Sequence, residues 1–545
     1  MTLRNKVNSL SCYWVPVVIA AILKVWLLST DSIPFNADEA IVALMARHIN
    51  QGKLPVFFYG QAYMGSMDAI LVALGFRIFG EHIWVIRVIQ SLLYLGTVCT
   101  TALLGFRLLD SRRAALFSGL LAAIPPVNIT LYSTISLGGY GEMLLVGNLL
   151  LLGGLEIYRR ITTQRLKADR GLFALLLIWG IFAGFGFWVL GLSLVYSIPV
   201  ILMLIWAIKS TDNARLYIPA AAILIIGGII GSLPWWIFAI GDGSVLVISE
   251  LTGSAIAGLR NNSGLLQPLV RLGNLLLFGS TVILGLRPPW TVRWLMLPLL
   301  PFLLVFWFAV LINSFNTKAS QKEQTELWMI RLIGIVLLIG FILTPYGADP
   351  SGRYFVPLII PMAIFGADLL TGQTQGKTYL SLGVLILVLF FNLGGTVQSV
   401  RSNPPGVTTQ FDSVTQIDQR DMGDLIAFLE LEEVTRGYSN YWVSYPLAFL
   451  SKEQLVFVPR LPYHEDFRYT ARDDRYPPYH ELVQTAEEVG FITTNHPDLD
   501  NYLRTQFEVR GITWQEEKIG EFQVFYDLST IIRPQELGLG RTTTP

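Results

Sequence analysis

The sequence predicts a polytopic α-helical membrane protein of about 11 spans that ends in a small soluble α/β domain. The first reason is composition: of 545 residues, 53% are hydrophobic and only 14% are charged, whereas soluble domains carry about 25% charged residues. The second is a mean hydropathy of +0.53. The third is uneven charge: residues 400–545 hold 13 Lys and Arg against 23 Asp and Glu, whereas residues 1–399 hold 26 against 16.

These values exclude a soluble enzyme, a collagen-like fibre and a disordered chain, and they divide the sequence into two bodies. We expect a membrane domain at residues 1–395, within which residues 30–82 form a long first outer loop. A linker at 396–420 then leads to a soluble domain at 421–530. A disordered tail is expected at 531–545.

Eleven apolar stretches approach the roughly 20 residues that a membrane-spanning helix needs. A further stretch at 265–286 either spans or lies in the interface. The predicted spans are 13–29, 83–105, 114–132, 141–158, 172–190, 192–208, 216–239, 290–312, 328–345, 354–370 and 378–395.

Orientation follows from Lys and Arg, which concentrate in cytoplasmic loops. Basic residues precede the first span and recur at 107–113 and 159–170. The N-terminus is then cytoplasmic, and the loops at 30–82 and 133–140 face outward from a plasma (inner) membrane. With 265–286 as a span, the C-terminal domain is cytoplasmic; without it, the domain is outside. We expect 11 spans and an outer domain.

The first outer loop carries the most informative residues. Apolar side chains recur at helical spacing from residue 41 to 49, which predicts an amphipathic helix on the membrane surface. Asp38 and Glu39 fall in its first turn. A carboxylate there can act as general base toward an acceptor hydroxyl. The alternative is capping, since Asn36 followed by Glu39 three residues later is a capping-box arrangement, and both roles can coexist.

Other candidates lie at the outer ends of the spans. Gln61 and Tyr63 in the Gly60–Gly65 loop either contact a sugar or belong to an interfacial aromatic belt. Tyr140 and Glu142 open a span, and an acid at membrane depth is a functional candidate by default. Arg353 and Tyr354 open a later span. An Arg there either binds a lipid-linked phosphate bidentately or anchors the helix.

Within the membrane, Lys24 lies in the middle of a span. A lysine there either extends its ammonium to the interface or pairs with another buried group.

The soluble domain alternates helical and extended patterns, which is typical of a small α/β fold. The aromatic run Tyr438–Tyr445 either stacks on a sugar or belongs to the core. The five His residues are scattered, which gives no convincing metal site. The expected helices are 421–434, 481–489 and 499–506; the expected strands are 455–458, 491–494 and a hairpin of 507–513 with 522–526.

Several of these motifs occur in an ordered set that resembles the glycosyltransferase C-fold superfamily, in its protein O-mannosyltransferase and aminoarabinose-transferase-like branch. The set covers roughly residues 10–370. Its members are Asp38-Glu39-Ala40, Met45 to Arg47, Gly52, Pro55, the Gly60–Gly65 loop, Phe79-Gly80, Pro234-Trp235-Trp236 and Arg353-Tyr354.

The resemblance implies an inverting transferase that uses a polyprenyl-phosphate sugar on the outer face of the membrane. By resemblance, Asp38 serves as base or positions the acceptor, Glu39 is its partner, and Arg353 meets the donor phosphate. The lipid-linked sugar is a substrate, so no cofactor is implied, and dependence on a divalent metal stays open. The expected partners are the bilayer, the donor lipid and a lipid, glycan or protein acceptor, with no nucleic acid.

One feature departs from the pattern. Many members carry Lys-Pro-Pro or His-Pro-Pro after the loop tyrosine, but here Tyr63 precedes Met64-Gly65-Ser66. The basic group that meets phosphate in those members is therefore missing from this loop, and Gln61 or another group must substitute for it.

Two other classes of protein remain as alternatives. A transporter or lipid flippase would carry internal repeats and broken helices at the midplane, whereas the charged residues here concentrate at the outer edge. A membrane scaffold that binds a partner through its tail would keep its function after Asp38→Ala.

Overall fold

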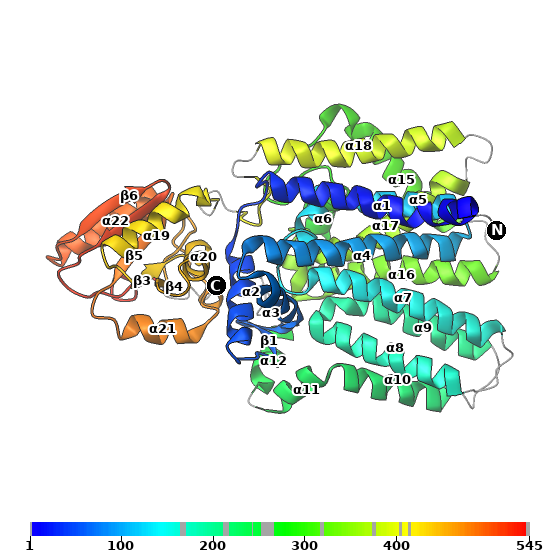
Figure 1. Ribbon diagram of the computed structural model, residues 1–545, viewed down its shortest axis with the longest axis horizontal. Coiled ribbons are helices and arrows are strands. Elements are labelled where there is room, and N and C mark those ends of the chain that lie inside the picture. Colours follow the sequence, from blue (N-terminus) through cyan, green and yellow to red (C-terminus); the bar gives the residue numbers. More distant parts are fainter. Residues whose placement is uncertain are drawn as a thin grey trace.

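The computed structural model describes residues 3–163, 170–210, 217–241, 243–251, 266–316, 321–372, 378–402, 406–411 and 416–540. Figure 1 shows long, nearly parallel helices forming a bundle at one side and a sheet domain at the other, with the short elements of the first loop between them. The chain is therefore a multi-pass membrane protein with a separate C-terminal α/β domain, as predicted.

Nine segments of the described residues are long and apolar enough to cross a membrane. Each corresponds to a predicted span. The helices that form them are α1 (Leu3–Ser29), α4 (Ile83–Leu109), α7 (Tyr140–Thr163), α8 (Arg170–Val189), α9 (Leu194–Ser210), α15 (Leu300–Asn316), α16 (Gln321–Leu343), α17 (Ile359–Gly372, entered through the 3₁₀ turn η7, Arg353–Leu358) and α18 (Thr378–Ser402).

The other two predicted spans are broken. The stretch 216–239 forms α10 (Tyr217–Gly231) and α11 (Leu233–Ile240), which meet at 70°. The stretch 114–132 forms α5 (Arg112–Ala123) and α6 (Val127–Tyr132). Two consecutive prolines at 125 and 126 separate α5 from α6, because proline lacks the N–H and restricts the residue before it. The hydropathy of the sequence locates both stretches but does not reveal the breaks.

The ambiguous stretch 265–286 forms three short consecutive elements. They are α13 (Gln267–Asn274), the π-helical turn η4 (Leu275–Gly279) and α14 (Ser280–Ile283). Arg271 donates from Nη1 to the carbonyl of Ile342 (3.4 Å), at the end of α16. The three elements contain 8, 5 and 4 residues. Even taken together, they are shorter than the roughly 20 residues of a span.

The first loop builds the surface on which the C-terminal domain sits. Its elements are α2 (Ala37–Asn50), β1 (Phe57–Phe58), β2 (Gln61–Gly65) and α3 (Met67–Phe79). The helix was expected to lie on the membrane surface, but α2 is buried from Glu39 to His48. It lies between the bundle and the C-terminal domain (Figure 1), so its polar residues face protein partners rather than water.

The C-terminal domain contains a mixed five-stranded sheet of order β4-β3-β5-β7-β6. Strands β4, β3 and β5 are parallel, and β7 runs antiparallel to β5 and β6. The elements are α19 (Met422–Leu431), β3 (Arg436–Ser439), α20 (Tyr441–Leu450), β4 (Val456–Pro459), α21 (Pro477–Gln484), β5 (Gly490–Thr494), α22 (Pro497–Val509), β6 (Gln515–Ile519) and β7 (Phe522–Tyr526).

Two local predictions for this domain are wrong. Phe507 belongs to α22 and not to a strand, because it completes a buried helical stripe with Leu499 and Leu503 at a spacing of four. The closing hairpin is instead β6–β7. The segment expected to be disordered from residue 531 packs on the domain as far as it is described, with Leu537 and Leu539 buried; residues 541–545 lie outside the described residues.

Two further contacts fix the loops around the site. Lys24 is buried, and its ammonium donates to the carbonyl and hydroxyl of Ser133 (2.8 and 2.7 Å) and to the hydroxyl of Thr134 (2.6 Å). It therefore pairs within the bundle and does not extend to the interface. Val407, beyond α18, donates its N–H to the carbonyl of Ser32 (2.9 Å). Gly406 permits this approach, because a Cβ there would lie 2.2 Å from that carbonyl.

Candidate active site

A cavity of about 310 Å³ lies where the first loop, the bundle and the C-terminal domain meet. Each of these parts contributes side chains to its wall. The lining residues are Asp38, Gln61, Tyr63 and Met64 from the first loop; Tyr132, Leu137, Tyr140, Asp349 and Arg353 from the bundle; Thr409 and Phe411 from the linker; and Tyr441, Trp442, Tyr463, His464, Arg468, Thr470, Arg472, Asp473 and Arg475 from the C-terminal domain.

Asp38 reaches this cavity from the first turn of α2. The side chain of Asn36 caps that helix by accepting a hydrogen bond from the N–H of Glu39 (3.0 Å), which fixes the direction of the first turn. Tyr441, the first residue of α20, donates its hydroxyl to Oδ1 of Asp38 (2.6 Å). Burial, followed by the charge of Asp38, raises the pKa of Tyr441 well above its ordinary value, so the phenol remains a donor.

Glu39 lies beside Asp38 in sequence but does not line the cavity. Its carboxylate is fully buried and accepts two hydrogen bonds from the guanidinium of Arg87 on α4 (3.1 and 2.9 Å). A paired, buried carboxylate of this kind anchors α2 to the bundle, and removing one partner would leave an uncompensated charge. The structure therefore divides the acid pair into a cavity-facing residue and an anchoring residue.

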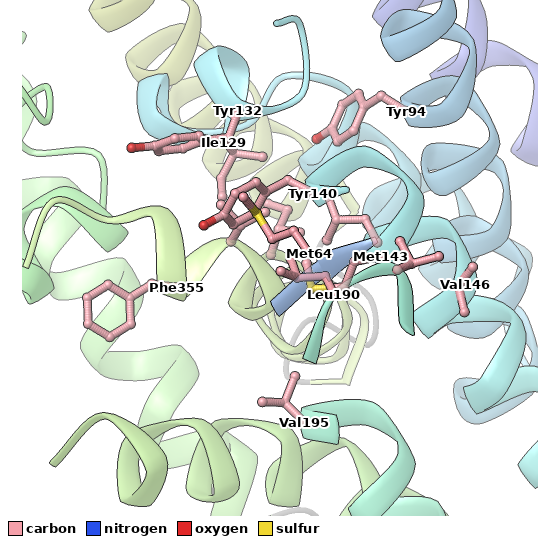
Figure 2. Packing of buried hydrophobic residues seen from close by; sticks show 14 of the residues in the cluster. Met64, Tyr94, Ile129, Tyr132, Tyr140, Met143, Val146, Leu190, Val195 and Phe355 are labelled. Carbon is pink, nitrogen blue, oxygen red and sulfur yellow. The ribbon is translucent and has the colours of Figure 1, made fainter. Parts of the chain in front are cut away.

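Arg353 opens the η7 turn and also lines the cavity. Its guanidinium pairs with Asp349 (2.6 Å) and lies 4.9 Å from the ring centroid of Tyr354. Tyr354 itself does not line the cavity. Tyr132 and Tyr140 stand near Arg353 with their ring centroids 5.7 Å apart, among the buried residues drawn in Figure 2.

Glu142 is also buried away from the cavity, next to Asp68 of α3. Asp68 accepts hydrogen bonds from Gln90 (2.7 Å), from the hydroxyl of Ser136 (2.5 Å) and from the N–H of Gly138 (3.2 Å). Burial raises the pKa of Asp68, against the opposing effect of these donors. The acid thus fixes the loop at 136–139, and that loop carries Tyr140 to the cavity wall.

Gln61 and Tyr63 contact two arginines of the C-terminal domain. With its amide oriented to satisfy its neighbours, the oxygen of Gln61 accepts from Nη1 and Nη2 of Arg475 (2.6 and 2.8 Å) and from Nη2 of Arg472 (3.2 Å). The guanidinium of Arg472 lies 5.7 Å from the ring centroid of Tyr63. Gln61 and Tyr63 therefore both line the cavity, and each contacts the guanidinium of an arginine.

The segment that carries these arginines follows β4 and is held by Tyr445 of α20. The Tyr445 hydroxyl donates to the carbonyl of Asp473 (3.0 Å) and accepts from the N–H of Arg475 (2.5 Å). Burial raises the pKa of the Asp473 side chain to about 7, although Arg475 and Arg472 partly offset this rise. Near neutral pH the Asp473 carboxyl is therefore ionised in only part of the molecules.

Sequence reasoning identified five lining residues and missed the contribution of the C-terminal domain. Of the eight predicted site residues, Asp38, Gln61, Tyr63, Tyr140 and Arg353 line the cavity, whereas Glu39, Glu142 and Tyr354 do not. The signals for the missed residues were present. The aromatic run at 438–445 supplies Tyr441 and Trp442 to the cavity but also Tyr438 and Tyr445 to the core. The arginines 468, 472 and 475 form a cluster between β4 and α21.

Among the described residues, no group of three or more His, Cys, Asp or Glu side chains is arranged to hold a metal ion. The polar side chains that line the cavity include carboxylates, phenols and guanidiniums. Such a set can take up a proton from a hydroxyl and bind an anion.

Comparison with solved structures finds the same architecture in membrane glycosyltransferases. ArnT from Cupriavidus metallidurans, an aminoarabinose transferase solved with undecaprenyl phosphate, is 13% identical and superposes with a TM-score of 0.59 over 96% of this chain and 99% of its own. The archaeal oligosaccharyltransferase AglB from Archaeoglobus fulgidus, solved with an inhibitory peptide and a dolichol-phosphate, is 14% identical. It superposes with a TM-score of 0.54 over 90% of this chain and 70% of its own.

At the level of sequence, neither protein-family models nor curated proteins give a match. The likeness in structure nevertheless extends over both the bundle and the C-terminal domain of ArnT, because nearly the whole of each chain is covered. This protein has the fold of the glycosyltransferase C superfamily.

Proposed function

We propose that the protein transfers a sugar from a polyprenyl-phosphate donor to an acceptor hydroxyl or amide at the outer face of the membrane. The observation that carries this proposal is the shared cavity of Asp38 and Arg353, a carboxylate and a guanidinium held by different elements at one end of the helical bundle. The undecaprenyl phosphate in ArnT and the dolichol-phosphate in AglB support a lipid-linked donor. The acceptor is a lipid, a glycan or a protein.

The reaction needs two groups on opposite sides of the anomeric carbon. The Asp38 carboxylate takes the proton of the acceptor while the acceptor atom forms its bond to that carbon. The bond between the anomeric carbon and the phosphate oxygen breaks, and its electron pair leaves with polyprenyl phosphate. Arg353 stabilises the charge that grows on the departing phosphate. Attack from the face opposite the phosphate inverts the anomeric centre.

The remaining predicted residues take supporting roles. Gln61, Tyr63 and Tyr140 contact the sugar or the phosphate from the cavity wall. Glu39 holds α2 through its ion pair with Arg87, and the ring of Tyr354 packs against the guanidinium of Arg353. The hydrogen bond from Tyr441 of the C-terminal domain to Asp38 of the first loop supports a common side of the membrane for both. The segments 107–113 and 159–170 are rich in Lys and Arg, which is typical of cytoplasmic loops. This pattern supports the outer side of the membrane for the first loop and the C-terminal domain.

The proposal is tested by transfer in vitro with purified protein in lipid. A panel of radiolabelled polyprenyl-phosphate sugars is offered to the wild type, to Asp38→Asn and to Glu81→Gln. Glu81 is a matched control, because it is a first-loop acid that pairs with Arg47 outside the cavity. We expect label transfer by the wild type and the control, with a loss of about 100-fold or more in Asp38→Asn. Full transfer by Asp38→Asn would rule out Asp38 as the general base.

A further inference from the structure

The cations that line the cavity come mostly from the C-terminal domain. The bundle contributes Arg353, whereas the C-terminal domain contributes Arg468, Arg472 and Arg475. The first-loop lining residues are an acid, an amide, a phenol and a thioether. Any anion that binds beside the first loop is therefore met by the soluble domain.

Arg472 and Arg475 are held in fixed positions. Both guanidiniums donate to the amide oxygen of Gln61. Arg475 is 8% exposed, and its guanidinium lies 5.5 Å from the ring centroid of Tyr441. The guanidinium of Arg472 approaches Glu250 at 3.6 Å. Both guanidiniums line the cavity while Gln61 and, for Arg472, the carboxylate of Glu250 hold them in place. Planar guanidiniums bind phosphate oxygens through paired N–H donors.

Four arginines and three aspartates line the cavity, which gives its wall an excess of positive charge, and Arg472 also pairs with Glu250 at 3.6 Å. Asp349 already pairs with Arg353 at 2.6 Å, so one negative charge at that wall is compensated within the bundle. Near neutral pH, Asp473 carries only part of a negative charge, as its raised pKa of about 7 requires. A phosphate diester carries one negative charge, and the monoester released on transfer carries between about 1.5 and 2. One arginine that is already paired compensates this increase poorly.

We propose that Arg472 and Arg475 of the C-terminal domain form a phosphate-binding site in the cavity that Arg353 also lines. The soluble domain then completes the donor site, and the membrane domain alone is insufficient to hold the leaving phosphate. The same arginines substitute for the basic group that the Tyr63 loop lacks. The identity of the ligand as the donor lipid rests on the proposed function, whereas the phosphate chemistry rests on the arginines.

The test measures binding and not transfer, with the full-length protein in lipid nanodiscs. The probes are a short polyprenyl monophosphate, the corresponding uncharged polyprenol and inorganic phosphate. The variants are Arg472→Gln, Arg475→Gln and Arg475→Lys. Arg504→Gln is the matched control, because Arg504 belongs to the same domain and pairs with Glu516 away from the cavity. Thermal unfolding of each variant identifies any that fails to fold.

We expect each Gln variant to bind the monophosphate at least about tenfold more weakly, because each loses charge-assisted hydrogen bonds. Arg475→Lys should recover part of this loss, and the polyprenol and the control should show no change. Unchanged monophosphate affinity in both Gln variants that fold would overturn the inference. A wild type that binds inorganic phosphate through these arginines, but not the lipid, would overturn the proposed donor and keep the phosphate site. A wild type that binds neither would overturn both.

Discussion

The hydroxyl of Tyr441 in the C-terminal domain contacts the proposed base, Asp38, and Tyr441→Phe removes this hydroxyl alone. In Tyr441→Phe the ring keeps its packing against Arg475 and Tyr445, and only the hydrogen bond to Asp38 is lost. That bond is short, at 2.6 Å, and its donor side chain is 4% exposed. Water therefore replaces it poorly, and the carboxylate of Asp38 loses the group that fixes its direction.

The magnitude follows from the type of bond. A hydrogen bond to a charged group contributes about 1.5–3 kcal/mol. If Asp38 must point at the acceptor in the transition state, this corresponds to a fall in turnover of roughly tenfold to a hundredfold. Because Tyr441 acts through Asp38, the loss should appear in kcat more than in KM for the donor.

The assay is steady-state transfer with a labelled polyprenyl-phosphate sugar, with Tyr479→Phe as control. The hydroxyl of Tyr479 also donates to a carboxylate, that of Glu453 in the same domain, at 2.7 Å. Glu453 in turn contacts His48 of the first loop at 3.0 Å. Tyr479 does not line the cavity. Tyr479→Phe should therefore lose a bond of the same kind while turnover stays within about twofold, since no group in the cavity changes.

Two results would refute this reasoning. The first is equal turnover of Tyr441→Phe and the wild type, which would mean that the hydroxyl does not orient Asp38. The second is a full additional loss when Tyr441→Phe is combined with Asp38→Asn. A hydroxyl that works only through Asp38 has little left to do once that carboxylate is gone, so the two losses should be strongly non-additive.

Two further predictions concern stability. Lys24→Met leaves the buried oxygens of Ser133 and Thr134 without their donor and should lower the free energy of unfolding by about 1–3 kcal/mol, measured as a lower thermal midpoint in detergent; an unchanged midpoint would contradict this. Burial opposes ionisation of Glu453, but hydrogen bonds from His48 and Tyr479 outweigh it and lower its pKa from 4.5 to about 2. The contribution of Glu453 to stability is therefore complete above pH 4.5 and is lost as the pH falls toward about 2. We expect Glu453→Gln to be less stable than the wild type by about 1–2 kcal/mol after allowance for partial exposure. This difference should shrink over that pH range in hydrogen-exchange measurements at the domain interface. A difference that stays constant from pH 6 to pH 3 would exclude this carboxylate as its source.

Local patterns in the sequence determined most of the membrane architecture. Nine predicted spans coincide with helical segments long enough to cross a bilayer, because an apolar run of that length satisfies its own backbone hydrogen bonds only as a helix. The helical spacing at 41–49 located α2, and Asn36 identified its N-terminus. Asp38 and Arg353 stood out because a carboxylate at the membrane–water boundary can act as a general base and an arginine there can bind a lipid-linked phosphate.

Other features of the sequence admitted more than one structure. Apolarity continues through 114–132, yet two adjacent prolines break that stretch into α5 and α6. The sequence around Phe507 is compatible with a strand. In the structure Phe507 belongs to α22, where it shares a buried stripe with Leu499 and Leu503. The acid pair Asp38-Glu39 was consistent with capping, catalysis or both, and only the position of Arg87 separated the two side chains.

The composition of the wall facing the first loop was decided by tertiary structure alone. Asp38 and Tyr441 are separated by 403 positions, and Gln61 meets arginines more than 400 residues away. Periodicity reports which face of a helix is apolar, but not which distant surface will cover that face. The docking of the C-terminal domain on α2 decides which residues cover that helix, because buried polar groups require specific hydrogen-bond partners from the opposing surface. The sequence by itself therefore determined a membrane bundle with an acid and an arginine at one end, and the packing of the second domain decided which residues surround them.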